Sequence, residues 1–311
     1  MNLLKMGILF LLVLGFQACD SSRNVDIVGW GDSMMKGAGG DKSMLEVLAK
    51  ELNIKHKNFA VGGLNSSSIA VLQGGLPLRL VLENNEILKE QPTKIEYYTI
   101  ESLNFLTKQY RKGFIETTKG QLKRISDEEN VEKTIGYTFK AKNIDKPIKT
   151  KDTVVFNFED AIKYNDKWTI IWAGRNDNKS GDFIFKTRDN IQAMIDYLGE
   201  NAQEHVLVLS ICNGIADYEQ KGSTAHKDII RLNSVLKETF GERFIDVRSY
   251  MVQNAIYDME TTPTEIDLED IKKDCIPRSF LKDNVHFNTL GYEAAGKYVA
   301  NIIKDKGWMT N

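Results

Sequence analysis

Five short runs of β-prone, mostly apolar residues alternate with helical patterns, and this alternation constrains the fold of the chain more than any other feature. The runs lie at 25–30, 57–61, 168–173, 205–211 and 243–247. Apolar residues at helical spacing lie at 43–52, 187–198, 224–240 and 290–303. Strands that alternate with helices indicate βαβ units, and apolar residues on both faces of a strand indicate a parallel sheet covered on both sides. We therefore predict a three-layer α/β/α sandwich.

One segment, 74–166, departs from this pattern. It consists of short β-prone runs separated by polar turns, and it has no helical pattern of comparable strength. The clearest runs lie at 78–83, 95–100, 135–139 and 153–158. Between them, 119–133 is highly charged, so we expect it to be solvated. We predict that 74–166 is an inserted β subdomain, a small barrel or sandwich, within a main domain formed by 19–73 and 167–311.

The length and composition fit one large domain with such an insertion. A chain of 311 residues with 42% hydrophobic side chains can bury a full core. Its 41 Lys and Arg residues are interspersed with 43 Asp and Glu residues and form no basic block. Nucleic-acid binding normally requires such a block, so we set this class of function aside.

The amino terminus has the layout of a secretory signal peptide. Lys5 provides the positive charge, residues 6–16 form an apolar stretch, and Cys19 follows shortly after. The apolar stretch is shorter than the about 20 residues that span a bilayer. A cysteine at this position resembles the bacterial lipoprotein signal, which implies that residues 1–18 are removed and that Cys19 is lipidated. We therefore expect an exported lipoprotein, anchored on the periplasmic or cell-surface face of a membrane; the alternative is a freely secreted protein in which Cys19 is incidental.

Cysteine and histidine usage gives no indication of a metal site. Apart from Cys19, only Cys212 and Cys275 are present, and we expect them at the same end of the sheet. In an exported protein these two could form a disulfide, or both could be free thiols. Neither has the spacing of metal ligands, and the four histidines are scattered at 56, 205, 226 and 286. We therefore predict no metal and no cofactor.

A serine lies on the turn after the first predicted strand, in the sequence Gly31-Asp32-Ser33. This is the carboxyl end of the strand, where open α/β sheets bind their ligands. Serine is a weak nucleophile by itself. To attack a carbonyl group it needs a histidine base, a group that orients the base, and hydrogen-bond donors for the oxyanion.

Candidates for these partners lie in loops that should meet at the same edge of the sheet. Asp283 precedes His286 by three residues, a spacing at which the carboxylate can reach Nδ1 of the ring and direct Nε2 toward a nucleophile. Gly63 follows the second strand, and its backbone N–H could point at a ligand; its neighbour Gly62 is the alternative. Asn176 follows a later strand and could direct its side-chain amide over the sheet edge.

These blocks, in this order, resemble the SGNH hydrolases, the GDSL-type esterase and lipase family. The blocks are Gly31-Asp32-Ser33, Gly63, Gly174-Arg175-Asn176-Asp177, and Asp283 with His286. The resemblance covers 24–304 apart from the insert, and it implies a flavodoxin-like α/β/α fold. It also implies a catalytic triad of Ser33, His286 and Asp283. The oxyanion hole that it implies consists of the backbone N–H groups of Ser33 and Gly63 and the side chain of Asn176.

The resemblance further implies an enzyme that hydrolyses esters through a serine nucleophile. Exported members with a β insert, and with a sequence such as Gln73-Gly74-Gly75 leading into it, resemble carbohydrate-directed esterases. We therefore expect a short acyl group, in particular acetyl, on a carbohydrate or cell-wall glycan. One alternative is a lysophospholipase or thioesterase, for which Met34, Met35 and Leu64 could line an apolar groove. The other is a glycan-binding lipoprotein without catalysis.

Two further features have alternative interpretations. Arg175 lies inside the third block. Either it faces an anionic group, or it faces solvent or forms a structural ion pair. The aromatic residues of the insert form either the core of a small β unit or a platform on which sugars stack. These residues are Tyr97, Tyr98, Phe105, Tyr110, Phe114, Tyr137, Phe139, Phe156 and Phe158.

Overall fold

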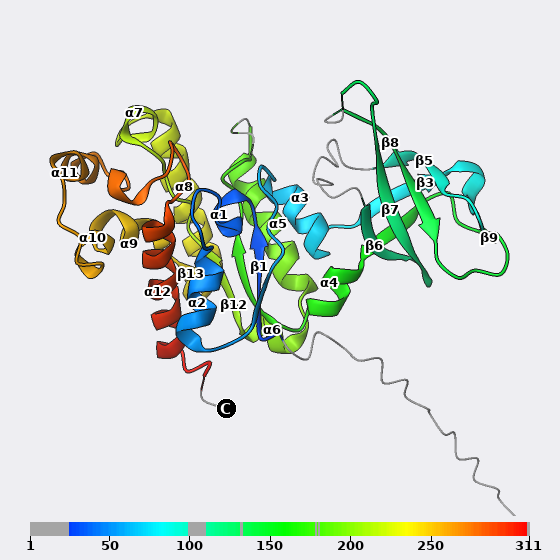
Figure 1. Cartoon of the computed structure of the whole chain (residues 1–311), viewed down its shortest axis with the longest axis horizontal. Coiled ribbons are helices and arrows are strands. Elements are labelled where there is room, and N and C mark those ends of the chain that lie inside the picture. The colour runs from blue at the N-terminus through cyan, green and yellow to red at the C-terminus, as the bar shows by residue number, and fades with distance from the viewer. Residues whose placement is uncertain (1–24, 99–109, 131–132, 178, 180, 310–311) are drawn as a thin grey trace, which may run out of the picture.

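The computed structural model shows an α/β domain beside a small β-barrel (Figure 1). It describes residues 25–98, 110–130, 133–177, 179 and 181–309. The predicted signal peptide at 1–18 and Cys19 lie outside these residues. Within them, we find no helix that is both long and apolar enough to cross a membrane.

The α/β domain is built on one sheet of parallel strands. In chain order these are β1 (Ile27–Gly31), β2 (His56–Asn58), β11 (Trp168–Trp172), β12 (Val206–Leu209) and β13 (Phe244–Ile245). Their order across the sheet is β13-β12-β11-β1-β2, and every neighbouring pair is parallel. This is the flavodoxin-like order, in which the strand order reverses between β1 and β11. The prediction of a flavodoxin-like α/β sandwich with a parallel sheet is confirmed.

Helices cover both faces of the sheet. α2 (Met44–Leu52) and α12 (Thr289–Asp305) pack together on one face. The layer on the other face consists of α3 (Ser66–Gln73), α5 (Phe183–Tyr197) and α8 (Thr224–Phe240) (Figure 1). Glycine in β1 lets the first layer approach closely, since a Cβ on Gly29 would lie 2.8 Å from both Leu45 and Met35. The core is therefore shared between the sheet and both helical layers.

The longer helices follow the helical patterns of the sequence, whereas the shorter ones were not predicted. The patterns at 43–52, 187–198, 224–240 and 290–303 correspond to α2, α5, α8 and α12. The unpredicted helices are α1 (Ser33–Lys36), α4 (Glu159–Tyr164), α6 (Glu200–Glu204), α7 (Ala216–Glu219), α9 (Val247–Gln253), α10 (Ala255–Asp258) and α11 (Glu265–Lys272). Helices this short depend on tertiary packing for their stability, as the complete burial of Met251 and Ile256 illustrates.

The insert forms a closed β-barrel. Its strands follow one another in the order β10 (Val154–Phe158), β3 (Leu78–Leu82), β5 (Thr93–Tyr98), β8 (Thr134–Ala141), β7 (Thr118–Ser126) and β6 (Tyr110–Ile115). Pairing of β6 with β10 closes the barrel. A separate ribbon pairs β4 (Glu86–Ile87) with β9 (Ile148–Lys149). The predicted β subdomain is present as a barrel, and part of the charged stretch 119–133 forms β7 with alternate side chains exposed.

Apolar side chains fill the interior of the barrel. Those exposed by 1% or less include Leu80, Ile115, Leu122, Tyr137, Phe139 and Phe156. The rings of Phe139 and Phe156 meet edge to face, with their centres 6.0 Å apart. These aromatic residues form a packed core, whereas Tyr97 and Tyr110 are 62% and 49% exposed on the outside. Phe105 lies outside the described residues.

The barrel joins the α/β domain beside the edge strand β2. The connection is made by α4, which follows β10 and leads back to β11. Lys57 Nζ of β2 donates a hydrogen bond to the Tyr164 hydroxyl at 3.1 Å and lies 3.5 Å from Asp160 Oδ1, both in α4. The same ammonium group lies 4.8 Å from the centre of the Phe59 ring, which stacks on Trp30 of β1 at 4.4 Å. This cluster attaches the insert to the sheet.

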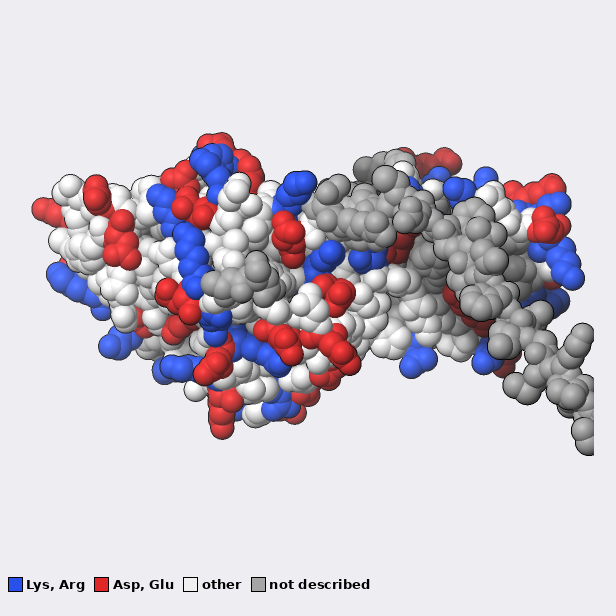
Figure 2. All heavy atoms as spheres, turned by 90° about the horizontal axis from the view of Figure 1, so that it is seen from below, with Lys and Arg blue, Asp and Glu red and all other residues white. Residues whose placement is uncertain are grey.

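Charged residues of both signs are spread over the surface. Figure 2 shows the molecule from below, and Lys and Arg lie among Asp and Glu on this face. Ion pairs at the surface of the insert include Lys149 with Glu86 at 3.3 Å and Lys133 with Asp127 at 3.4 Å. Pairs this exposed contribute little to stability, because solvent screens them.

Cys212 and Cys275 are buried free thiols. Of the two alternatives, the structure therefore shows the free thiols and no disulfide between these two residues. Burial raises the pKa of Cys212 to about 12 and that of Cys275 to about 11. Since the thiolate is the reactive form of cysteine, both side chains are poor nucleophiles at neutral pH.

Candidate active site

Ser33 lies at the carboxyl edge of the sheet, where α1 begins just after the end of β1. β1 ends at Gly31, and the side chain of Asp32 caps α1 by accepting a hydrogen bond from the Met34 N–H at 2.9 Å. Gly37, with a φ of +86°, ends the helix after one turn. Ser33 is the first residue of α1, so its backbone N–H has no acceptor within the helix.

Asp32 is buried directly beside the serine, with 1% of its surface exposed. Burial raises the pKa of its carboxyl to about 7, although the hydrogen bond from Met34 and the positive charge of Arg175 act in the opposite direction. No role of its own was predicted for Asp32. An Asp immediately before a first helical turn is nevertheless a recognisable N-cap signal.

His286 reaches Ser33 from the loop that precedes α12. Its Nε2 lies 2.9 Å from Ser33 Oγ, and its Nδ1 lies 2.8 Å from Asp283 Oδ2. When Nδ1 carries the proton, the ring donates to the carboxylate and accepts from the serine hydroxyl. The structure therefore brings together three of the predicted site residues, across a sequence separation of 253 positions.

Asp283 is held in a tight turn by the backbone that follows it. Its Oδ1 accepts hydrogen bonds from the N–H groups of Val285 and His286, both at 2.8 Å. Partial burial raises the pKa of Asp283, but the hydrogen bonds from His286 and Val285 outweigh this effect and hold the pKa below its usual value. The carboxylate is therefore ionised at neutral pH and can stabilise a positive charge on the imidazole ring.

Hydrogen bonds connect the first turn of α12, just after the histidine loop, with the segment that follows α1. Tyr292 of α12 is fully buried, and its hydroxyl donates to Ala38 O at 2.9 Å. Thr289 Oγ1 donates to Asp41 Oδ2 and accepts from the Asp41 N–H, each at 3.0 Å. These contacts limit how far the histidine loop can move relative to the serine turn.

Gly62 lies next to Ser33, and Gly63 follows it in the chain. A Cβ on Gly62 would lie 3.7 Å from Ser33 Cβ, whereas a Cβ on Gly63 would meet no atom within 4 Å. Gly63 has a φ of +79°, in the left-handed region that favours glycine. None of the described residues accepts a hydrogen bond from the Gly63 N–H, so this donor remains for a ligand.

Asn176 and Asp177 follow β11, and their side chains form hydrogen bonds with the segment just after Gly63. Asn176 Nδ2 donates to Leu64 O at 3.0 Å, and an amide has a second N–H for another acceptor. Asp177 accepts hydrogen bonds from the Ser66 N–H and, at 2.8 Å, from the Ser66 hydroxyl. Burial raises the pKa of Asp177, and the hydrogen bonds from Ser66 oppose this rise. This role of Asp177 was not predicted, because Ser66 is 111 positions away in the sequence.

Arg175 forms a structural ion pair, which was one of its two interpretations. Its Nη1 lies 2.9 Å from Glu219 Oε1, and the two side chains are only 12% and 11% exposed. The other carboxylate oxygen, Oε2, accepts a hydrogen bond from the Gly214 N–H at 2.6 Å. Nothing in the local sequence indicates this role for Glu219, because Arg175 is 44 positions away.

Comparison with known proteins identifies the family. The sequence profile of the GDSL-like lipases and acylhydrolases matches residues 27–299. The chain belongs to this family. It is therefore a hydrolase of ester bonds. No curated protein matches the sequence of this GDSL hydrolase.

Solved structures similar to this GDSL hydrolase have low sequence identity. One is described as a lipolytic protein of the G-D-S-L family from Desulfitobacterium hafniense. It is 11% identical, with 90% of this chain and 99% of that chain covered and a TM-score of 0.45. Another is described as an acylhydrolase from Bacteroides fragilis. It is 14% identical, with 90% and 86% covered and a TM-score of 0.45.

The apolar residues near the serine belong to the core of the GDSL hydrolase. Met34, Met35 and Leu64 are 3%, 0% and 6% exposed. Their side chains pack inside the domain and do not line a groove open to solvent. The interpretation in which they hold a long acyl chain therefore has no support in their positions.

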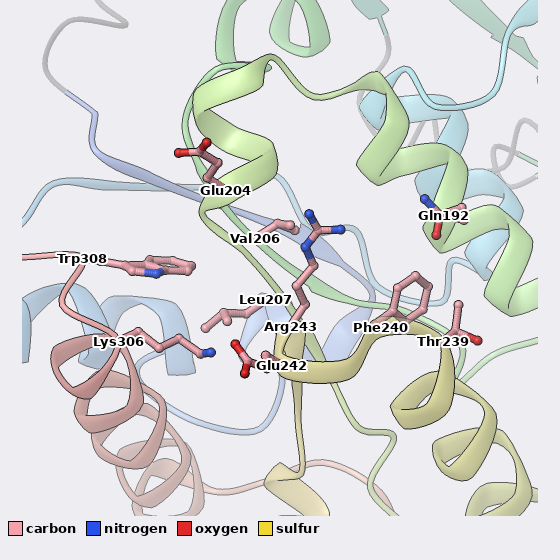
Figure 3. A pocket seen from close by; sticks show the side chains of 10 residues that line it. All are labelled: Gln192, Glu204, Val206, Leu207, Thr239, Phe240, Glu242, Arg243, Lys306 and Trp308. Carbon is pink, nitrogen blue, oxygen red and sulfur yellow. The ribbon is translucent and has the colours of Figure 1, made fainter.

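A pocket of about 420 Å³ lies at the opposite edge of the sheet (Figure 3). Val206 and Leu207 at the start of β12 line it, as does Arg243 just before β13. Ser33 follows the carboxyl end of β1, so this pocket is separate from the serine site. Among the residues that the structure describes, no group of three or more His, Cys, Asp or Glu side chains is placed to hold a metal ion.

Proposed function

We propose that this GDSL hydrolase is an exported serine esterase that removes short acyl groups, in particular acetyl, from a carbohydrate or cell-wall glycan. The proposal rests above all on the two hydrogen bonds that connect Ser33 Oγ to His286 Nε2 at 2.9 Å and His286 Nδ1 to Asp283 Oδ2 at 2.8 Å. At these distances a base can take the proton of a serine hydroxyl while a carboxylate orients the ring. Ser33 is the nucleophile, His286 the base and Asp283 the orienting group.

The reaction proceeds in two halves. His286 Nε2 takes the hydroxyl proton as Ser33 Oγ attacks the ester carbonyl carbon, and the ring then gives that proton to the departing alcohol oxygen. The acyl group is left as an ester on Ser33. His286 next takes a proton from water, the resulting hydroxide attacks the acyl carbon, and the acid leaves as the proton returns to Ser33 Oγ.

Three donors are available for the oxyanion of the tetrahedral intermediates. They are the backbone N–H of Ser33, the backbone N–H of Gly63, and the amide N–H of Asn176 that Leu64 O does not use. A donor of this kind lowers the barrier by about 3 kcal/mol, because it is already oriented before charge develops.

Packing around the serine supports a short acyl group. The apolar side chains nearest in sequence, Met34 and Met35, are buried in the core and offer no surface to a lipid tail. The barrel interior is filled with its own side chains, so the inserted barrel provides no cavity for such a tail either. In contrast, the Asp283 side chain is 53% exposed, which leaves the site open to a bulky polar alcohol.

The proposed anchor at Cys19 fits this substrate. Cys19 precedes Ile27, the first residue of β1, by eight positions, which span at most about 28 Å of extended chain. Ser33 follows the opposite end of the same strand. A lipid on Cys19 would therefore attach the chain to the membrane through the amino edge of the sheet, the edge opposite to Ser33. Cys19→Ser is expected to move the protein from the membrane fraction to the soluble fraction; an unchanged distribution would contradict the anchor.

The catalytic proposal is tested with an aryl acetate and a fluorophosphonate probe. Wild type is expected to hydrolyse the ester and to be labelled at Ser33, and Ser33→Ala is expected to lose both properties at an unchanged Tm. Ser234→Ala, at an exposed position of α8, is the matched control and should behave as wild type. Hydrolysis retained by Ser33→Ala would refute the assignment of the nucleophile.

A second screen distinguishes the substrate classes. Acetylated sugars, aryl esters of graded chain length and lysophospholipids are compared at equal enzyme concentration. We expect kcat/KM to fall as the acyl chain is lengthened. Preference for long chains or lysophospholipids would favour a lipase. A wild type that binds glycans, hydrolyses none of the esters and is not labelled would favour the non-catalytic lipoprotein.

A further inference from the structure

The segment that follows β12 packs directly against the loop that carries His286. The Ile215 N–H donates to Asn284 O at 3.0 Å. Gly214 lies so close to this loop that a Cβ on it would be 2.0 Å from the same oxygen. Asn284 lies between Asp283 and His286 in the sequence, so a displacement of Gly214 would be transmitted to both.

Glu219 of α7 holds Gly214 in its position. Its Oε2 accepts a hydrogen bond from the Gly214 N–H at 2.6 Å, while its Oε1 pairs with Nη1 of Arg175 at 2.9 Å. Both charged side chains are almost buried, and the desolvation of a buried pair offsets most of its attraction. We therefore expect the pair to contribute little to the free energy of unfolding. Its structural contribution is that the two oxygens of the Glu219 carboxylate connect two separate loops.

Arg175 belongs to the other half of the site. It directly precedes Asn176, whose amide is the proposed oxyanion donor. Its positive charge also opposes the rise in pKa that burial causes at Asp32, the residue before Ser33. The guanidinium group thus lies near the serine turn and the oxyanion donor, and Glu219 connects it to the histidine loop.

We propose that the Arg175–Glu219 ion pair is a positioning device of the active site. Through Gly214 and Asn284 it holds the loop of His286 at the distance from Ser33 that proton transfer requires, and in a fixed position relative to Asn176. This inference rests on the proposed serine mechanism. Neither Arg175 nor Glu219 contacts the reacting atoms, so both act on turnover only through the position of other groups.

Two changes at Glu219 separate the charge from the contact with the loop. Glu219→Gln keeps an oxygen that can accept the Gly214 N–H but removes the charge that faces Arg175. Glu219→Leu removes both contacts. Because a misplacement of about 1 Å can lower a rate by about 100-fold, we expect kcat to fall by about 10-fold in the Gln variant and about 100-fold in the Leu variant. KM should stay within about twofold, since the binding surface is not altered.

A second ion pair with a buried carboxylate provides the control; its arginine, Arg278, is 42% exposed. Asp270 is 3% exposed on its side chain, accepts the Arg278 N–H at 3.1 Å and lies 3.5 Å from Arg278 Nε. Its partners are a backbone N–H and an arginine side chain, as for Glu219, but both come from Arg278, so Asp270 does not connect two loops; it belongs to a different helix, α11. Asp270→Asn is expected to leave kcat unchanged.

The experiment measures kcat, KM, Tm and the rate of phosphonate inactivation for all variants. The inference is supported if the folded Glu219 variants have a lower kcat and a lower inactivation rate while Asp270→Asn has wild-type values of both. If Glu219→Leu does not fold, Glu219→Gln and Arg175→Lys provide the test. Wild-type kcat and inactivation rate in these folded variants overturn the inference, as does an equal loss in Asp270→Asn. Failure of the serine mechanism is distinguishable, because wild type itself would then not be labelled at Ser33.

Discussion

Replacing Gly214 by alanine should misplace the histidine loop by an amount that the structure specifies. A Cβ at this position would lie 2.0 Å from Asn284 O, and ordinary contacts of a Cβ begin at 3.4 Å. Gly214→Ala must therefore move the two segments apart by about 1.4 Å. The φ of Gly214 is outside the left-handed region, so alanine adds no backbone strain of its own. Since misplacement by about 1 Å can lower a rate by about 100-fold, we expect kcat to fall by at least about 100-fold.

The assay is steady-state hydrolysis of an aryl acetate at a temperature well below Tm. KM should change by less than about twofold, because the displaced group acts on the transition state and not on substrate binding. Gly136→Ala in the barrel is the matched control, since a Cβ there would meet its nearest neighbour, Ile125 Cδ1, at 4.0 Å. Wild-type kcat in folded Gly214→Ala would refute the reasoning, and so would an equal loss in Gly136→Ala.

Three further predictions concern the oxyanion donor, the buried carboxyl and the contact between the two loops. Asn176→Ala removes one donor and should lower kcat in aryl acetate hydrolysis by about 100-fold, or about 3 kcal/mol in the barrier, at nearly constant KM and Tm; a loss expressed only in KM would contradict this role. Burial raises the pKa of Asp32 from 3.8 to about 7, so the folded state binds the proton more tightly than the unfolded state does. This contribution to stability is complete below about pH 4 and is lost as the pH rises through about 7. Asp32→Asn keeps the capping oxygen and should remove that part of the pH dependence of urea unfolding; an unchanged slope between pH 4 and 8 would show that another group causes it. Tyr292→Phe removes a part-buried hydrogen bond to Ala38 O and should lower the free energy of unfolding in urea by about 0.5–1.5 kcal/mol; wild-type stability would argue against this hydrogen bond.

Local patterns were sufficient to predict the framework of the α/β domain. The strand at 168–173 and the helix at 224–240 were expected from the residues alone and are observed as β11 and α8. The reason is that burial on both faces of a strand, or on one face of a helix, produces a repeat within a single short segment. The resemblance to a known family then indicated the order of the strands across the sheet.

The short helices and the closure of the barrel were not predictable in this way. The segment from Val247 to Lys272 forms three helices, each too short to show a clear period. Closure of the barrel depends on pairing of Phe156 with Ile115, which are distant in the chain. A β-prone run reports that a strand forms, but its partner is selected by the packing of the whole subdomain. The predictions at 1–18 and Cys19 stay predictions.

The sequence by itself determined which residues are candidates for chemistry. Asp283 and His286 are separated by three positions, and the serine and the asparagine each follow an apolar strand, so each feature is visible within a short segment. Only the tertiary structure decided how near these residues lie to one another, with His286 Nε2 2.9 Å from Ser33 Oγ across 253 positions. The same holds for Glu219, because no residue near it in the sequence indicates that it connects two loops. Periodicity is a local property, whereas a contact between distant loops exists only after the sheet and its helices have brought their ends together.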